Sequence, residues 1–240
     1  MRLARRVAAL AAAAVLAALA LTASALAQGD ADRGRRLFLE GCASCHGLAA
    51  RGIPGNGPSL RGVGARSADF YLATGRMPLS HPGDEPTRAT PLYSSEEIDD
   101  LVAYVGSLGG PPIPDVRPER GQLNEGLRLF SEHCAGCHQV VGEGGIVDGA
   151  VAPALHAASA AQIAEAVRVG PYLMPRFAES EISDDELNSI VRYVLETRSP
   201  DDRGGWGIGH IGPIPEGMVA WLIGGAVLVV LARLIGRRLA

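Results

Sequence analysis

All four cysteines of this chain lie in two short segments, and a histidine directly follows each pair. The first segment is Cys42-Ala43-Ser44-Cys45-His46 and the second is Cys134-Ala135-Gly136-Cys137-His138. In this C-x-x-C-H spacing the two thiols lie one helical turn apart, so each can add to a haem vinyl group while the histidine reaches the iron. The pattern therefore predicts two covalently bound haem c groups. The predicted thioether bonds are at Cys42, Cys45, Cys134 and Cys137, and the predicted iron ligands are His46 and His138.

Other roles for paired cysteines fit this sequence less well. The two cysteine pairs of a structural zinc site usually lie closer to each other in sequence than these two pairs do. Here, in addition, a histidine directly follows each pair. A thioredoxin-like redox pair needs a strand-and-helix framework, whereas these pairs lie in helical, glycine-rich sequence. Two haem groups would leave no cysteine for a disulfide.

One methionine follows each motif at a matching place and is the candidate sixth ligand of its iron. Met77 lies 31 residues after His46, Met174 lies 36 residues after His138, and a proline follows each methionine. Methionine also fills gaps in apolar cores, but one per haem motif favours ligation, which raises the reduction potential and closes the iron to oxygen. His81 is the alternative ligand of the first iron. His133 and His156 are interpreted as structural.

The chain between its two ends is an internal repeat. Gly34-Arg35-Arg36-Leu37-Phe38 returns 92 residues later as Gly126-Leu127-Arg128-Leu129-Phe130, which indicates two copies of one haem module. Each module is expected to close with a helix that Ser94 or Ser183 caps and that packs its apolar stripe on the opening helix. The stripes are Ile98, Leu101, Val102 and Val105 in the first module, and Leu187, Ile190, Val191 and Val194 in the second.

These patterns place the first domain at residues 30–108 and the second at 122–198. Each has about 80 residues, a size at which a covalent cofactor adds much to a marginal core. The proline-rich linker 109–121 is expected to be extended. Strand patterning is weak, and the glycine- and proline-rich segments 48–64 and 140–153 are expected to be loops around the haem.

The N-terminal segment, residues 1–27, has the features of a signal peptide. Arg2, Arg5 and Arg6 precede an apolar run, and Ala25-Leu26-Ala27 suits signal peptidase. The alternative is that the uncharged stretch remains as an anchor helix.

The C-terminal segment is predicted to cross a membrane once. Residues 217–236 form an apolar stretch long enough to span a bilayer, after a juxtamembrane linker at 199–216. Arg233, Arg237 and Arg238 place the C-terminus in the cytoplasm by the positive-inside rule. The haem domains would therefore lie on the outer face of the cell membrane.

Charge narrows the range of partners. Residues 28–232 contain 16 basic and 26 acidic side chains. This acidic balance argues against nucleic acid or anionic lipid as a partner of the exported part. Electrostatic steering toward a basic surface of a partner protein would explain the acidic balance, and so would solubility alone. The sequence favours neither explanation.

The order of these features resembles the dihaem cytochrome c subunit of the actinobacterial-type quinol–cytochrome c reductase, the cytochrome bcc complex. Both modules have C-x-x-C-H, a proline and Met-Pro, and Gly209-His210-Ile211-Gly212-Pro213 introduces the membrane helix. The resemblance implies a mainly α fold with two tandem class I cytochrome c domains followed by a single C-terminal transmembrane helix. It also implies that Pro58 and Pro153 offer their carbonyl groups to the imidazoles of the ligand histidines.

The resemblance further implies a relay of single electrons within a dimeric membrane complex that acts as a translocase. A cytochrome b subunit would oxidise quinol, and a Rieske iron–sulfur protein would deliver electrons to the first module. The second module would pass them toward a terminal haem-copper oxidase. No catalytic residue and no substrate-converting site is expected in this chain.

Four other functions fit the sequence to different degrees. A dihaem peroxidase or a haem sensor needs an open iron site, which two methionine ligands argue against. A subunit of a cbb-type oxidase would have its membrane helix before the haem motifs. An electron-transfer subunit of a membrane-bound dehydrogenase would have the same sequence features as this chain.

Overall fold

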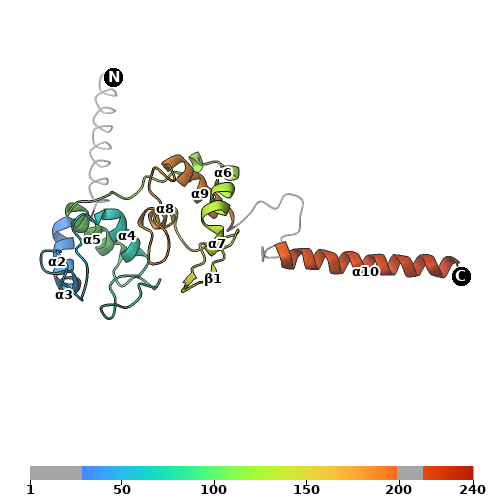
Figure 1. Cartoon of the computed structure of the whole chain (residues 1–240), viewed down its shortest axis with the longest axis horizontal. Helices are drawn as coiled ribbons and strands as arrows, with labels where there is room; N and C mark the ends of the chain where they lie inside the picture. Colours follow the sequence, from blue (N-terminus) through green and yellow to red (C-terminus); the bar gives the residue numbers. More distant parts are fainter. Residues whose placement is uncertain (1–28, 199–212, 240) are drawn as a thin grey trace, which may run out of the picture.

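The computed structural model describes residues 29–198 and 213–239, and the elements in this part of the chain are mainly helices (Figure 1). The predicted signal peptide and most of the predicted juxtamembrane linker lie outside the described residues. The first module contains α2 (Ala31–Gly41), α3 (Ala43–His46), α4 (Gly64–Ala73) and α5 (Ser95–Ser107). The second contains α6 (Leu123–His133), α7 (Ala135–His138), α8 (Ala160–Val169) and α9 (Asp184–Glu196) in the same order.

Each module is built on a close crossing of its first and last helices, α2 with α5 and α6 with α9. A Cβ atom on Gly34 would overlap the carbonyl oxygen of Asp100, and one on Gly126 would overlap the carbonyl oxygen of Ser189. Only glycine lets two backbones approach so closely at these points. The repeated glycine of the sequence therefore marks the helix crossing.

Aromatic side chains fill the space beside each crossing. The rings of Phe38 and Tyr104 lie 5.2 Å apart in the first module, and those of Phe130 and Tyr193 lie 5.4 Å apart in the second. Both pairs are tilted, an arrangement that aromatic rings prefer to a face-to-face stack. The predicted apolar stripes of α5 and α9 are buried in the same cores, so their packing on the opening helices is confirmed.

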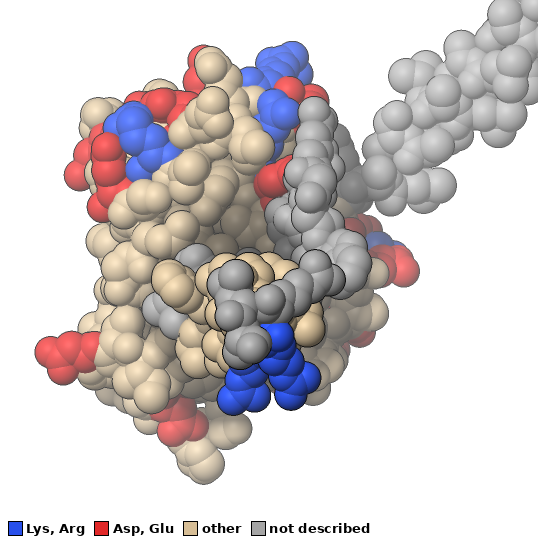
Figure 2. Space-filling model, turned by 90° about the vertical axis from the view of Figure 1, so that its right-hand side faces the viewer, with Lys and Arg blue, Asp and Glu red and all other residues tan. Residues whose placement is uncertain are grey.

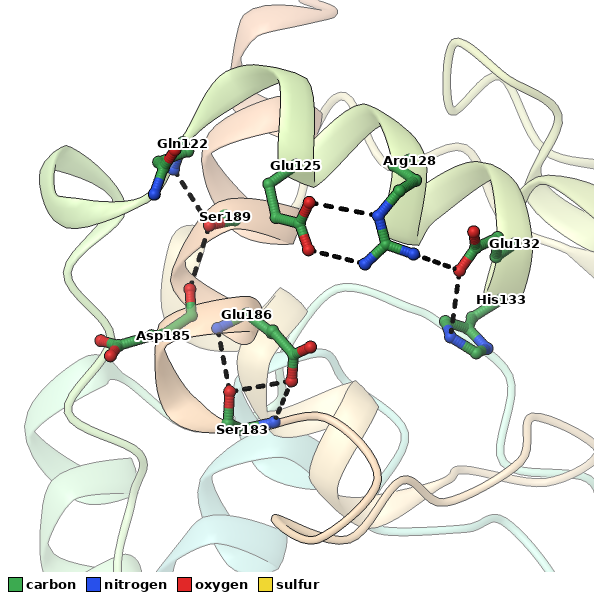
Figure 3. Close-up of polar contacts among 9 residues, drawn as sticks. All are labelled: Gln122, Glu125, Arg128, Glu132, His133, Ser183, Asp185, Glu186 and Ser189. Carbon is green, nitrogen blue, oxygen red and sulfur yellow. Dashed lines mark hydrogen bonds and ion pairs between the residues drawn. The ribbon is translucent and has the colours of Figure 1, made fainter.

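A polar contact holds the start of each opening helix to its closing helix. In the first module the amide of Asp30 donates to the buried carboxylate of Asp100 at 2.6 Å, and Arg33 donates to the same carboxylate. The guanidinium group of Arg33 holds the pKa of Asp100 below its usual range. In the second module the amide of Gln122 donates to the hydroxyl of Ser189 at 3.0 Å (Figure 3). In both modules, a backbone amide just before the opening helix thus donates to a side chain of the closing helix. The acceptor is a carboxylate in the first module and a hydroxyl in the second.

Ser94 and Ser183 cap the closing helices, as the sequence predicted, and each serine is part of a capping box. The hydroxyl of Ser94 accepts from the amide of Glu97, whose carboxylate accepts in return from the amide of Ser94. Ser183 and Glu186 form the same pair at the start of α9 (Figure 3). Each pair satisfies backbone amides that have no partner within the helix.

Two segments differ from the expectations drawn from the sequence, one from a loop and one from an extended linker. Residues 140–153 contain an antiparallel hairpin of β1 (Gly145–Val147) and β2 (Ala150–Ala152). The turn between them is Asp148-Gly149, a pair that favours tight hairpins. The two strands are too short to show an alternating pattern of apolar and polar residues in the sequence. The linker ends in the short 3-10 helix η1 (Pro118–Arg120), which packs on α9 instead of staying extended.

The two modules meet where α4 of the first packs on α8 of the second (Figure 1). Glu165 on α8 is fully buried, and neither of its carboxyl oxygens has a hydrogen-bond donor among the described residues. The neighbouring carboxylate of Asp69 on α4 is also an acceptor, so a proton on Glu165 is needed to join them. Burial and the hydrogen bond with Asp69 raise the pKa of Glu165 to about 9, against the opposing charge of Arg66.

This protonated carboxyl predicts a pH-dependent stability. The pKa of Glu165 rises from 4.5 to about 9 on folding, so the wild-type fold loses stability as the pH rises through that interval. In Glu165→Gln the side-chain amide can donate an N–H to Asp69, so this contact no longer requires a proton from solvent. We expect the variant to be more stable than wild type by on the order of 2 kcal/mol at pH 8, with no difference near pH 4.5.

Thermal unfolding of the detergent-solubilised holoprotein, followed by circular dichroism at several pH values, measures this margin. The exposed linker carboxylate of Glu119 provides the control, because Glu119→Gln should give no pH-dependent margin. If Glu165→Gln is less stable than wild type at pH 8, or if the difference in stability between them does not change with pH, Glu165 does not hold a proton that bonds to Asp69.

Helix α10 (Pro213–Leu239) begins four residues before the predicted span. Its segment Gly217–Arg237 is long and apolar enough to cross a membrane, and none of the most apolar window is buried within the molecule. Large apolar side chains such as Trp221 and Leu222 are exposed. The predicted C-terminal apolar helix is therefore present.

Charged side chains are spread over the face of the molecule that Figure 2 shows. Acidic and basic groups lie beside one another along the upper part of this face, and the other charged groups stand separately around a broad neutral area. On this face the acidic excess found in the sequence is not gathered into one patch.

Candidate haem sites

Each C-x-x-C-H motif forms a single helical turn at the end of its opening helix. The amide of Cys42 donates to Phe38 O at 2.8 Å, and the amide of His46 donates to Cys42 O at 2.9 Å. The corresponding bonds in the second module join Cys134 to Phe130 O and His138 to Cys134 O, at 2.8 and 2.9 Å. None of the four cysteines forms a disulfide bond. The buried phenylalanine therefore fixes where each motif begins.

The imidazole of each motif histidine contacts a proline carbonyl. The Nδ1 atom lies 2.8 Å from Pro58 O in His46 and 3.1 Å from Pro153 O in His138. A carbonyl oxygen only accepts, so the partner assigns the proton to Nδ1. This tautomer leaves the Nε2 lone pair free to bind a metal.

Burial tunes these side chains toward uncharged forms. It lowers the pKa of His138, which the hydrogen bond to Pro153 partly offsets, and so favours the neutral imidazole that ligates metals. It raises the pKa of Cys134 to about 11 and raises that of Cys42. An uncharged thioether suits such surroundings better than a thiolate does.

A cavity of about 270 Å³ lies beside the second motif. Cys134, Cys137, His138 and Met174 all border it, and so does Pro153. Further apolar side chains complete the walls: Phe130, Leu155, Ile163, Val167, Ile190 and Val194. Two thiols, an imidazole and a thioether around one apolar space are the donor set that haem c requires, so the residues present fit this cofactor.

The two methionines occupy corresponding positions in the modules. Met77 is partly buried against the core of the first module, and Met174 is partly buried against the core of the second. Met174 borders the cavity that His138 also lines. Ligation of iron by either methionine stays a prediction.

The remaining histidines do not share one environment. His156 Nε2 lies 2.8 Å from Val141 O, which is a structural contact. His133, interpreted from the sequence as structural, borders the cavity, and its ring centroid lies 5.7 Å from that of Phe177. His81 is exposed and faces Asp84. Within residues 29–198 and 213–239, no group of three or more His, Cys, Asp or Glu side chains is placed to hold a metal ion.

Two family models match the chain, one over each module. The model described as cytochrome c matches residues 31–109, and the model described as cytochrome C oxidase, cbb3-type, subunit III matches residues 121–194. Both matches include a C-x-x-C-H motif. They confirm two cytochrome c domains.

Similar proteins extend over both modules. A cytochrome bc1 complex cytochrome c subunit from Mycobacterium leprae (strain TN) is 38% identical over 218 residues, which cover 85% of this chain and 74% of the relative. The subunit of the same name from Mycobacterium tuberculosis (strain ATCC 25618 / H37Rv) is 37% identical and covers 85% and 77%. A cbb3-type cytochrome c oxidase subunit from Azospirillum sp. (strain B510) is 30% identical and covers 67% and 60%.

The chain belongs to the family of cytochrome bc1 complex cytochrome c subunits. This bc1-family cytochrome c is thus a dihaem electron-transfer subunit, and the resemblance noted in its sequence is confirmed.

Sequence reasoning missed that the first module contributes to the second cavity. Residues of the first module line it: Phe70, Arg76, Glu85, Pro86, Thr87 and Arg88. The only local signal is that Arg76 directly precedes Met77. The side chain of Arg76 therefore lines the cavity of the second module, while the adjacent Met77 is the candidate ligand of the first iron.

The methionine assignment predicts a change in reduction potential. In Met174→His an imidazole replaces the thioether, and we expect the midpoint potential of one haem to fall by on the order of 0.1 V. Met77→His should lower the potential of the other haem in the same way. Spectroelectrochemical titration of the purified chain measures both potentials.

Met218 on α10 provides the matched control for this pair of variants. Met218→Leu should leave both potentials unchanged. If both potentials also stay unchanged in Met174→His, Met174 is not an iron ligand.

Proposed function

We propose that this bc1-family cytochrome c relays single electrons from the Rieske iron–sulfur protein of a quinol–cytochrome c reductase toward a terminal haem-copper oxidase. The observation that carries the proposal is the direct packing of two C-x-x-C-H modules through α4 and α8 in one chain. The similarity to named bc1 complex subunits over both modules supports the choice of complex.

Each module holds one haem c through its own side chains. Cys42 and Cys45 form the thioether bonds of the first site, and Cys134 and Cys137 form those of the second. His46 and Met77 ligate the first iron, and His138 and Met174 ligate the second. When bound, haem c supplies reversible one-electron transfer between ferrous and ferric iron.

The protein positions and tunes these groups. The carbonyl oxygens of Pro58 and Pro153 fix the ring orientation and basicity of the ligand histidines. Met ligation keeps the potentials high and denies oxygen a coordination site. No residue needs to act as an acid, a base or a nucleophile, so this chain is an electron-transfer subunit of a translocase complex.

The second module takes the place of a diffusible electron carrier. Its cavity shares a wall with the first module through Phe70 and Arg76, which supports a short path between the two sites. The first module faces the iron–sulfur protein and the second faces the oxidase. Joining both in one chain keeps their effective concentration high.

A membrane anchor keeps this relay beside its partners. Residues 217–236 span the cell membrane, with the C-terminus in the cytoplasm and both haem domains on the outer face. Residues 1–27 direct export and are removed. Cytochrome b and the Rieske protein are the partners within a dimeric complex, and the terminal oxidase associates with it.

A subunit of a cbb-type oxidase is the second candidate function. The match of residues 121–194 to a cbb3 subunit model and the similarity to the Azospirillum protein favour it. The apolar helix lies after both haem motifs in this chain, which favours the bc1 assignment.

Purification of the tagged chain in mild detergent tests the proposal. We expect cytochrome b and a Rieske protein to co-purify in equal amounts, together with subunits of a haem-copper oxidase. Cells expressing the untagged chain provide the control. Recovery of a cbb-type catalytic subunit or of a dehydrogenase without cytochrome b would overturn the assignment.

A further inference from the structure

Two arginines of the first module line the cavity of the second. The guanidinium carbon of Arg76 lies 4.8 Å from the centroid of the Phe70 ring, which orients the side chain toward the cavity that both residues line. The Nη1 atom of Arg76 is buried and has no hydrogen-bond partner among the described residues. A buried guanidinium nitrogen without a partner is costly, so this geometry calls for an acceptor.

The second arginine brings another positive charge to the same place. Arg88 donates from Nη2 to Gln162 Oε1 at 3.3 Å and to Ala157 O at 3.4 Å, which ties it to the second module. Burial and the charge of Arg88 lower the pKa of Arg76. Glu85 lines the same cavity, but within the described residues neither arginine forms an ion pair with a carboxylate. The pair therefore suits an anion from outside the protein.

Haem c itself carries two carboxylates, on its propionate groups. We propose that Arg76 of the first module binds a propionate of the haem held by Cys134 and Cys137, with Arg88 adding positive charge beside it. The inference rests on the proposed attachment of haem in the second module. Charge-assisted hydrogen bonds of this kind are short and strong, and a planar guanidinium fits a carboxylate in two-point contact.

The backbone around Arg76 links this contact to the first haem site. The amides of Arg76 and Met77 both donate to Tyr71 O, at 2.9 and 3.1 Å. Gly75 has φ +67 and lies so close to Ala89 that a Cβ would overlap its carbonyl oxygen. One fixed turn thus positions the candidate ligand of the first iron and the arginine at the second haem. Arg76 is a positioning residue between the two sites.

Redox titration of the full-length holoprotein tests this contact. Arg76→Gln removes a positive charge beside the second haem, so its ferrous form loses stability and its potential falls. We expect the electron-exchange equilibrium between the haems to shift about tenfold toward the first haem. Arg76→Lys keeps the charge and should give a smaller shift. The exposed Arg35 on α2 supplies the control, since Arg35→Gln should leave both potentials unchanged.

Haem content separates this inference from the proposed function. Thioether-bound haem is counted in every variant, and the second haem is the one whose potential moves in Met174→His. If Arg76→Gln keeps both haems and shows either no change in the potential of the second haem or an equal shift of both potentials, the propionate contact is overturned. Either result would leave the proposed function standing. Wild-type protein with fewer than two haems would overturn the proposed function as well.

If Arg76→Gln does not accumulate, the same titration on Arg76→Lys and Arg88→Gln decides. A fall in the second potential in either variant, with the first unchanged, supports the contact. No fall in both variants refutes it.

Discussion

The approach of two helix backbones at a glycine is the constraint on which each module depends. At Gly34 and Gly126 there is no room for a side chain, so the opening and closing helices cross in contact. That crossing buries Phe38 and Phe130, whose carbonyl oxygens hold the first cysteine of each motif. The thiols and the imidazole therefore stand at a fixed place relative to the core, before any cofactor adds its own contacts.

The contact between the modules has a different character. The helix crossings are close, and aromatic and aliphatic side chains fill the space beside them, whereas the α4–α8 contact carries Glu165 and Arg66 in buried positions. Buried polar groups at an interface add little net stability but specify one arrangement when every group is satisfied. A proton on Glu165 and a propionate at Arg76 would each satisfy a buried polar group at the contact between the modules. The relative position of the two haem sites would then depend on a proton and on the cofactor.

Local patterns predicted the motifs, the capping serines Ser94 and Ser183, the apolar stripes and the C-terminal helix, because each depends on residues close together in sequence. The hairpin at Gly145–Ala152 was missed because three-residue strands are too short for an alternating pattern. Glu165 and Arg76 were missed because their roles depend on packing between modules, which spacing along the chain does not reveal. The cavity position of His133 also depends on tertiary packing, here against Phe177.

The central claim is that this one polypeptide binds two haems covalently, one in each module. The mass of the intact mature chain, measured after extraction with acid acetone, tests it most directly. The account predicts the mass of the chain plus two haem groups, with loss of one haem when Cys134 and Cys137 are both replaced by serine. A mass equal to that of the polypeptide alone, or with a single haem, would contradict it.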